Sequence, residues 1–294
     1  MRRAVIDLGT NTFNLLIADC HTRQILFQTK VGVALGMGGI NEKRIDAAAI
    51  ERAMHALRAF SNHCETWKVQ DIQAIGTSAL RDAKNAAQLV EKARSELQIN
   101  IKIITGLQEA ELIYKGVQLS YVFDEPALIM DIGGGSTEFI LADFRGPIFA
   151  KSFDIGVSRL YQLFEFQDPF STDDIAKVED FLTHKCSSFF RQKISNNLIG
   201  ASGSFETFYE LLAEQPFEAK GKAVQIDTQK FETMLERIIS STQADRDINP
   251  HIIEIRKRMA PLAAIKTRWV MKAAQIEHIY ISPYSLKEGV LFGL

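Results

Sequence analysis

The chain has 294 residues, of which 46% are hydrophobic and 24% charged, and its formal net charge is −2. These values are those of an ordinary globular protein and exclude a largely disordered chain. A net charge this small gives the whole molecule no attraction to nucleic acid, so any anion site must be local. A chain of this length favours two domains over a single core.

Cysteine usage and hydropathy indicate the compartment in which the protein works. The cysteines are Cys20, Cys64 and Cys186, and their spacing fits neither a metal site nor a redox motif, which is typical of a reducing compartment. The chain opens on a strand pattern instead of a long apolar signal region, and no later stretch is long enough to span a bilayer. We therefore expect a soluble cytoplasmic protein that binds neither a membrane nor nucleic acid.

The first half of the chain reads as three strands followed by alternating helices and strands. A hairpin over 5–18 comes first, then strands over 24–33, 71–75 and 101–104, and helices over 50–60, 86–97 and 108–119. Residues 76–81 read as a loop that closes the strand before them. The polar, proline-bearing run Asp124-Glu125-Pro126 ends this half and marks the expected domain boundary.

The second half repeats this order. A hairpin of strands 128–131 and 139–142 leads to a strand over 148–153, a short helix over 156–164, a long helix behind the N-cap cluster 171–174, a strand over 197–201 and a helix near 204. Three further helices and one strand over 276–281 complete the chain. The repeated order predicts two α/β domains, residues 1–124 and 125–294.

The strongest functional signal is a duplicated hairpin tip. The two copies are Asp7-Leu8-Gly9-Thr10-Asn11-Thr12 and Asp131-Ile132-Gly133-Gly134-Gly135-Ser136-Thr137. Each joins two apolar strands through an Asp-apolar-Gly turn whose backbone N–H groups and hydroxyls form a concave anion site. The aspartate adds an oxygen ligand of the kind that Mg²⁺ prefers. Two such hairpins facing each other would clamp a phosphate chain and its metal.

Five segments in this order resemble the exopolyphosphatase and guanosine pentaphosphate phosphatase family, within the actin-like superfamily of sugar kinases and chaperone ATPases. They are the two tips above, Gly76-Thr77-Ser78-Ala79-Leu80-Arg81, the run from Gly106 to Val117, and Gly200-Ala201-Ser202-Gly203-Ser204. The resemblance implies two actin-like (ribonuclease H-like) domains with a central cleft between them. It also implies a last helix, near 285–292, that packs back on the first domain.

The activity that the resemblance implies is Mg²⁺-dependent release of terminal orthophosphate from inorganic polyphosphate, with guanosine pentaphosphate as the alternative substrate. Glu109 falls on the family's catalytic glutamate, so it would take the proton of the attacking water. Glu138, just past the glycine run, would position the metal-bound or the attacking water. Asp131 would hold Mg²⁺, with Asp7 as its pseudo-symmetric partner. The expected phosphate-binding residues are Gly9, Thr10, Asn11, Arg81, Gly133, Gly134, Gly135, Ser136, Thr137, Ser202 and Gly203.

The residues taken alone leave simpler roles open. Glu109 in the first turn of a helix is also typical of a partner for the helix dipole. Glu138 also fits an exposed strand carboxylate, and Arg81 also fits a surface ion pair. A set of basic residues near the C-terminus could hold the tail of a polyanion or form an ordinary solvated helix face. This set consists of Arg256, Lys257, Arg258, Lys266, Arg268 and Lys272.

The chain also departs from the family pattern. Gln108 and Glu111 stand where the family has a glutamate and an arginine, and residues 282–289 replace its usual Asp-Gly-Ala-Leu-Arg-Glu-Gly. A cleft can keep its phosphate loops and lose catalysis, so a non-hydrolysing sensor of guanosine pentaphosphate or tetraphosphate is an alternative function. A small-molecule kinase of the same superfamily is another, and it would need an adenosine pocket. Two-domain members of this fold often pair, so a homodimer is a further expectation.

Overall fold

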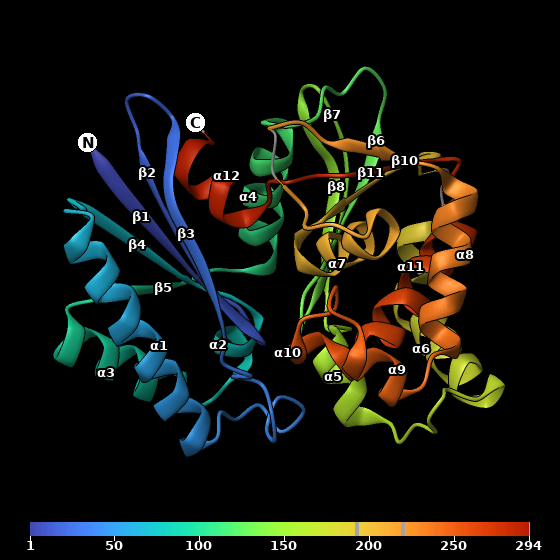
Figure 1. Ribbon diagram of the computed structural model, residues 1–294, viewed down its shortest axis with the longest axis horizontal. Helices are drawn as coiled ribbons and strands as arrows, with labels where there is room; N and C mark the ends of the chain where they lie inside the picture. The colour runs from blue at the N-terminus through green and yellow to red at the C-terminus, as the bar shows by residue number, and fades with distance from the viewer. Residues whose placement is uncertain (192–193, 219–220, 294) are drawn as a thin grey trace.

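The computed structural model describes residues 1–191, 194–218 and 221–293. The strands form two mixed sheets, one in each half of the chain, with helices packed around both (Figure 1). Among the described residues, no helix has the length and apolar character needed to cross a membrane. This architecture confirms the expected α/β class and the repeat of the strand order in the two halves.

The first sheet has the strand order β3-β2-β1-β4-β5. Its strands are β1 (Arg2–Leu8), β2 (Thr12–Asp19), β3 (Gln24–Gly32), β4 (Asp71–Gly76) and β5 (Ile101–Ile103). The first three strands run antiparallel, whereas β4 and β5 run parallel to β1. The helices of this half are α1 (Ala47–Thr66), α2 (Ser78–Asp82), α3 (Ala86–Leu97) and α4 (Gly106–Gln118).

The second sheet repeats that topology in the order β10-β11-β9-β6-β7-β8. Its strands are β6 (Ala127–Ile132), β7 (Thr137–Asp143), β8 (Gly146–Phe153), β9 (Asn197–Ala201), β10 (Val224–Ile226) and β11 (His278–Ile281). Strands β6, β7 and β8 match β1, β2 and β3, and β9 and β11 match β4 and β5. The short β10 pairs antiparallel with β11 and has no counterpart in the first sheet.

The helices of the second half include some that the sequence did not predict. They are α5 (Val157–Leu163), α6 (Thr172–Phe190), α7 (Ser202–Ala213), α8 (Thr228–Ser240), α9 (Gln243–Ile248), α10 (Glu254–Lys257), α11 (Ala260–Ala274) and α12 (Leu286–Phe292). After the helix near 204 we expected three further helices and one strand, which was wrong, since the described residues after α7 hold five helices, α8 to α12, and two strands, β10 and β11. Helix α10 has 4 residues and β10 has 3, too few to give a periodic pattern. The loop expected over 76–81 is also wrong in part, because α2 begins at Ser78.

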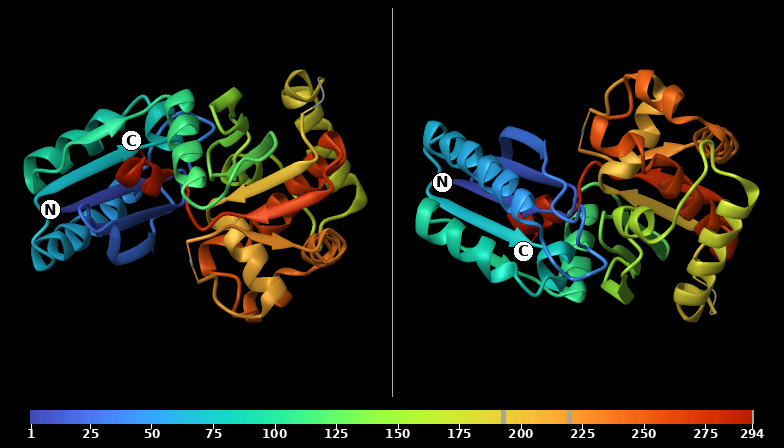
Figure 2. Two further views of the ribbon diagram at one scale, coloured as in Figure 1. Left: turned by 90° about the horizontal axis from the view of Figure 1, so that it is seen from above. Right: turned by 90° about the horizontal axis from the view of Figure 1, so that it is seen from below.

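Alternation along the central strands explains how each sheet is covered on both faces. In β1, Ala4, Ile6 and Leu8 join the core beneath α1, whereas Val5 points the other way and packs against Leu291 of α12. Helix α12 therefore covers the face of the first sheet opposite α1, and Figures 1 and 2 show it, in red, among the blue strands of that half. In the second sheet, α4 takes the equivalent place against β7 and β8.

Helices α4 and α12 cross closely between the two sheets because glycine lies at the crossing. A Cβ atom on Gly116 would collide with the carbonyl oxygen of Ser285, and one on Gly289 would collide with that of Leu112. The helix crossing thus holds the start of α12 against α4, at the edge of the space between the sheets. Helix α4 precedes residue 124 in the sequence yet packs on the second sheet. The domain boundary expected at residue 124 therefore stays a prediction.

Candidate active site

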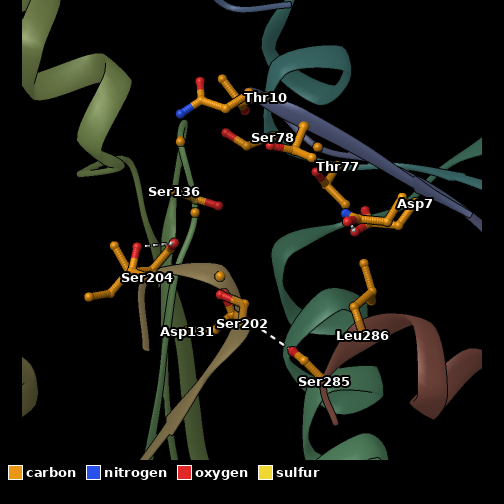
Figure 3. A pocket seen from close by; sticks show the side chains of 18 of the residues that line it. Asp7, Thr10, Thr77, Ser78, Asp131, Ser136, Ser202, Ser204, Ser285 and Leu286 are labelled. Carbon is orange, nitrogen blue, oxygen red and sulfur yellow. Dashed lines mark hydrogen bonds between the residues drawn. The ribbon is translucent and has the colours of Figure 1, made fainter. Parts of the chain in front are cut away.

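A cavity lies between the two sheets, where the two duplicated hairpin tips meet (Figure 3). Strands β1 and β6 both run toward it and end at the aspartate-glycine turns. The first turns of α4, α7 and α12 complete its wall. Of the predicted site residues, those that line this cavity are Asp7, Gly9, Thr10, Asn11, Glu109, Asp131, Gly133, Gly134, Gly135, Ser136, Ser202 and Gly203.

The first tip is held in place by hydrogen bonds between its own backbone carbonyls and a supporting segment outside the cavity. The Thr10 carbonyl accepts a hydrogen bond from the N–H of Gly36 at 3.1 Å, and the Asn11 carbonyl accepts one from Val33 at 2.8 Å. The carboxylate of Asp7 accepts a bond of 3.0 Å from the Asn14 side chain of the same hairpin. Burial raises the pKa of Asp7 to about 6. The Thr10 side chain lies in the gap between the two halves, near that of Ser78 (Figure 3).

The second tip is held in the same way by α5. The carbonyls of Gly133, Gly134 and Gly135 accept from the N–H groups of Val157 at 3.1 Å, Ser158 at 2.9 Å and Gly156 at 3.1 Å, respectively. Both tips therefore turn their carbonyls away from the cavity toward supporting segments. Anion binding in such a concavity depends on the N–H groups and hydroxyls that remain.

Glycine in the second tip is required by the first tip. A Cβ atom on Gly135 would lie 2.5 Å from the Ser78 hydroxyl and 2.7 Å from that of Thr10, and one on Gly134 would lie 2.8 Å from the Asn11 amide. The run of glycines thus lets the two halves approach each other directly. The tips face one another across the cavity, which is the arrangement that the repeat predicted.

Asp131 is the most thoroughly positioned carboxylate of the cavity. Its two oxygens accept hydrogen bonds of 2.7 Å from Ser202, at the start of α7, and of 2.7 Å from Ser285, just before α12. Figure 3 shows Asp131 beside Ser202, with a dashed line for the hydrogen bond to Ser285. Burial raises the pKa of Asp131, and the two serine bonds act against that rise. Ser202 was among the predicted site residues, whereas Ser285 was not, because its separation of 154 residues from Asp131 leaves no local signal.

Glu109 lies at the cavity wall and is paired with Arg81. The two side chains form an ion pair of 2.8 Å, and the same guanidinium also donates to the carbonyl of Ile104 at 3.2 Å. Burial raises the pKa of Glu109 well above its usual range, and the nearby Glu138 adds to that rise, whereas Arg81 opposes it. Arg81 does not belong to the described lining of the cavity; its charge acts on Glu109.

A capping box fixes the helix turn that carries Glu109. The Thr105 hydroxyl accepts from the N–H of Gln108 at 3.2 Å, and the Gln108 side chain accepts from the N–H of Thr105 at 2.9 Å. Gln108 is thus a structural residue of the α4 N-terminus. Because Gln can close a capping box as well as Glu, this departure from the family pattern leaves the turn intact.

Two predicted site residues lie behind the cavity. Glu138 is only 1% exposed, which excludes the exposed strand carboxylate considered above, and it accepts a bond of 2.7 Å from Ser152. Burial, together with the charge of Asp131, raises the pKa of Glu138 to about 7. Thr137 is fully buried and accepts a hydrogen bond from the ammonium group of Lys266.

Several cavity residues escaped the sequence analysis. Lys287 of α12 lines the cavity and forms an ion pair of 3.1 Å with Glu288. Although burial opposes it, the charges of Glu288 and Glu206 raise the pKa of Lys287, which therefore stays a cation. The lysine falls at the arginine position of the family's Asp-Gly-Ala-Leu-Arg-Glu-Gly segment, a signal that could have identified it. Glu206 and Ser285 were missed as well. The lining also includes residues that the sequence analysis named in a family segment or in the basic set without predicting them as site residues, namely Thr77, Ser78, Ser204 and Arg256.

The basic residues of the C-terminal segment do not form one surface. Lys266 is 1% exposed and donates to Thr137 and to the carbonyl of Ile155. Arg268 pairs with Glu179 and Glu236, each at 2.8 Å. The hypothesis of a shared site for a polyanion tail is therefore wrong, since helical spacing in the sequence does not separate a buried lysine from exposed ones.

The acidic residues fit a hydrated divalent cation better than a fully protein-ligated one. No three histidine, cysteine, aspartate or glutamate side chains in 1–191, 194–218 and 221–293 come together as a metal-binding group. Mg²⁺ often keeps several waters and uses one or two carboxylates, together with substrate phosphates. Asp131 and Asp7, which approach the cavity from opposite halves and both have a raised pKa, are the residues suited to that task.

Comparisons with known proteins agree with this fold. A model of the Ppx/GppA phosphatase family matches residues 16–294. An exopolyphosphatase from Cytophaga hutchinsonii is 33% identical, with a TM-score of 0.95 over 99% of this chain and 97% of that one. The chain belongs to the Ppx/GppA phosphatase family.

Two further proteins are similar to this chain at lower sequence identity. The guanosine-5'-triphosphate,3'-diphosphate pyrophosphatase of Aeromonas hydrophila subsp. hydrophila is 28% identical over 297 residues, which cover 99% of this chain and 59% of the relative. The chain thus spans little more than half the length of the curated relatives it matches. A family member from Aquifex aeolicus, 22% identical with a TM-score of 0.81 over 99% of this chain and 96% of its own, shares the fold.

Proposed function

We propose that this protein is an exopolyphosphatase, which releases terminal orthophosphate from inorganic polyphosphate with Mg²⁺. The observation that carries the proposal is the position of Glu109, a buried carboxylate on the wall of a cavity built from two phosphate-binding tips. The likeness over nearly the full length of both chains to an exopolyphosphatase of Cytophaga hutchinsonii supports it.

The proposed reaction divides the work among groups of this chain. The N–H groups and hydroxyls of the two tips hold the oxygens of the terminal phosphate. Glu109 accepts the proton of a water that attacks the terminal phosphorus, and the anhydride bond to the rest of the chain breaks. A bound Mg²⁺ would neutralise charge on the phosphate oxygens.

The environment of Glu109 strengthens its carboxylate as a base by raising its pKa. A general base is most effective when its pKa lies near the working pH. Burial and Glu138 raise the pKa of Glu109, while the ion pair with Arg81 fixes the carboxylate and limits that rise. In this proposal Arg81 positions the base instead of binding phosphate.

A second candidate is hydrolysis of guanosine pentaphosphate. The curated relatives named guanosine-5'-triphosphate,3'-diphosphate pyrophosphatase favour it, although this chain covers 59% of their length. Both substrates end in a phosphoanhydride, so the same tips and base serve either reaction.

The test is orthophosphate release by purified protein with Mg²⁺, comparing polyphosphate with guanosine pentaphosphate and repeating each with a chelator. Faster release from polyphosphate supports the first candidate, and faster release from the nucleotide supports the second. Tight nucleotide binding without release from either substrate would instead identify a non-hydrolysing sensor. Transfer of phosphate to an acceptor in place of water would identify a kinase.

A further inference from the structure

Arg159 of α5 joins the two halves of the molecule at a single guanidinium group. Its Nε donates to the carbonyl of Gly135 in the second tip at 3.1 Å. A terminal nitrogen donates to the carbonyl of Ile40 at 3.3 Å, and the other pairs with the carboxylate of Asp82 at 2.5 Å. Both Ile40 and Asp82 belong to the first half. The ion pair is largely shielded, with Arg159 11% and Asp82 20% exposed.

Asp82 connects this contact to Glu109 through one short helix. It is the last residue of α2, and Arg81, which pairs with Glu109, immediately precedes it. Neighbouring residues on a single turn cannot move independently, so a change at Asp82 displaces Arg81. The second tip is therefore connected to Glu109 by a series of contacts. Gly135 bonds to Arg159, Arg159 pairs with Asp82, and Arg81, the neighbour of Asp82 in the chain, pairs with Glu109.

From this geometry we infer that Arg159 and Asp82 are a positioning pair for the reaction. They set Glu109 relative to the glycine tip that holds the terminal phosphate. Neither residue belongs to the described lining of the cavity, so the pair acts through Gly135 and Arg81. The inference rests on the proposed function, since it assigns to the pair the placement of the proposed base.

A second bridge nearby offers a matched control. Gln162, one turn further along α5, donates to the carbonyl of Gly36 at 3.1 Å and accepts from the N–H of Gly38 at 2.8 Å. It joins the same two halves, and neither of these contacts touches α2. If the two contacts only held the two halves together, loss of either one would lower kcat equally.

The first experiment compares steady-state phosphate release by Arg159→Met, Asp82→Asn and Gln162→Leu. A displacement of about 1 Å at a reacting group costs about 10²-fold in rate. We expect kcat to fall by roughly this factor in Arg159→Met and Asp82→Asn. KM should change far less, because Gly135 keeps its bond from Gly156 at 3.1 Å. Gln162→Leu should keep a kcat near that of the parent protein.

Combining the two substitutions tests whether the residues act as a unit. The double variant Arg159→Met with Asp82→Asn should lose no more kcat than Arg159→Met alone. Losses that multiply in the double variant would overturn the inference. So would an equal loss in Gln162→Leu, or a parental kcat in Arg159→Met.

Amide hydrogen exchange tests the same pair without any substrate. Arg159→Met should raise exchange in residues 78–82, at a distance from the substitution, and Gln162→Leu should not. This readout separates two failures. If the parent protein releases no phosphate, the proposed function fails and the exchange result still decides the structural link. If the parent is active and residues 78–82 exchange unchanged in Arg159→Met, the positioning pair fails alone.

Discussion

The two hairpin tips share a backbone design and differ in how their aspartates are held. In both, carbonyls bond to a supporting segment outside the cavity, and the hydroxyl-bearing side chains that follow lie near the gap between the halves. Among the described residues, Asp7 takes one side-chain hydrogen bond, from Asn14 of its own hairpin. Asp131 takes two, from Ser202 and Ser285, which belong to elements far along the chain.

This difference shows how a duplicated fold acquires unequal halves. The local motif sets a tip and an aspartate in each half, whereas distant partners decide how precisely each carboxylate is oriented. Asp131 is fixed on both oxygens and Asp7 on one, so the second tip should dominate metal binding. The predictions below test this inequality and its consequences.

The largest difference between the two tips is expected for Asp131→Asn and Asp7→Asn. Groups that orient the ligands of a bound metal typically cost about 10–100-fold in affinity or activity when changed, and loss of a carboxylate that holds the metal should cost at least as much. Asp131→Asn should lose phosphate release by at least that factor and need more Mg²⁺ for half-maximal rate. Asp7→Asn should lose less, since its carboxylate is less constrained. The measurement is the rate of phosphate release by each variant as a function of Mg²⁺ concentration. A greater loss in Asp7→Asn would assign the dominant metal ligand to the first tip instead of the second.

A smaller effect concerns the pH dependence of the base. Glu109 acts deprotonated, and the charge of Glu138 raises its pKa. Glu138→Gln removes that charge, so the acid limb of kcat/KM should move to lower pH. Arg81→Met removes a stabilising cation and should move the limb to higher pH. Profiles measured at saturating Mg²⁺ check both directions, and a limb that stays fixed in both variants would exclude Glu109 as the titrating group.

The smallest effect is on stability and comes from Lys266, behind the second tip. Burial lowers the pKa of its ammonium from 10.5 to about 7, so between these values the unfolded chain binds a proton that the folded one lacks. Folding stability then rises with pH across this window. The cost of burying the charged ammonium group is greatest below about pH 7. Lys266→Met should flatten the rise in melting temperature from about pH 7 to pH 10.

Lys272→Met provides the control for that measurement. Lys272 is an exposed residue of the same helix, so this variant should keep the parental slope of melting temperature against pH. A parental slope in Lys266→Met as well would show that Lys266 does not titrate in this window.

Much of this molecule could be predicted because its signals are local. The duplicated tips, the alternating elements and caps such as Ser171 lie within a few residues of what they control, and α6 begins where its cap predicted. The partners that distinguish the tips could not be predicted in this way. Ser285 and Lys266 are brought to Asp131 and Thr137 by the fold, across separations of 154 and 129 residues.

The site also shows where residue type alone misleads. The fork of Arg81 suits phosphate, and in the fold it pairs with Glu109, so its role in binding phosphate stays a prediction. Lys266 belongs by spacing to a basic helix face, yet it is buried. In both cases the role of the side chain depends on which side of its helix packs inward. The sequence around the residue does not determine this.

The most direct test of the proposed mechanism compares Glu109→Gln with Glu111→Gln. Both residues lie on α4, but Glu111 is exposed and pairs only with Lys115 at 3.4 Å among the ion pairs of the described residues. Loss of a general base costs about 10²–10⁴-fold in rate. We therefore expect Glu109→Gln to bind polyphosphate normally and lose orthophosphate release by that factor, with Glu111→Gln unchanged. Parental release by Glu109→Gln would contradict the central claim.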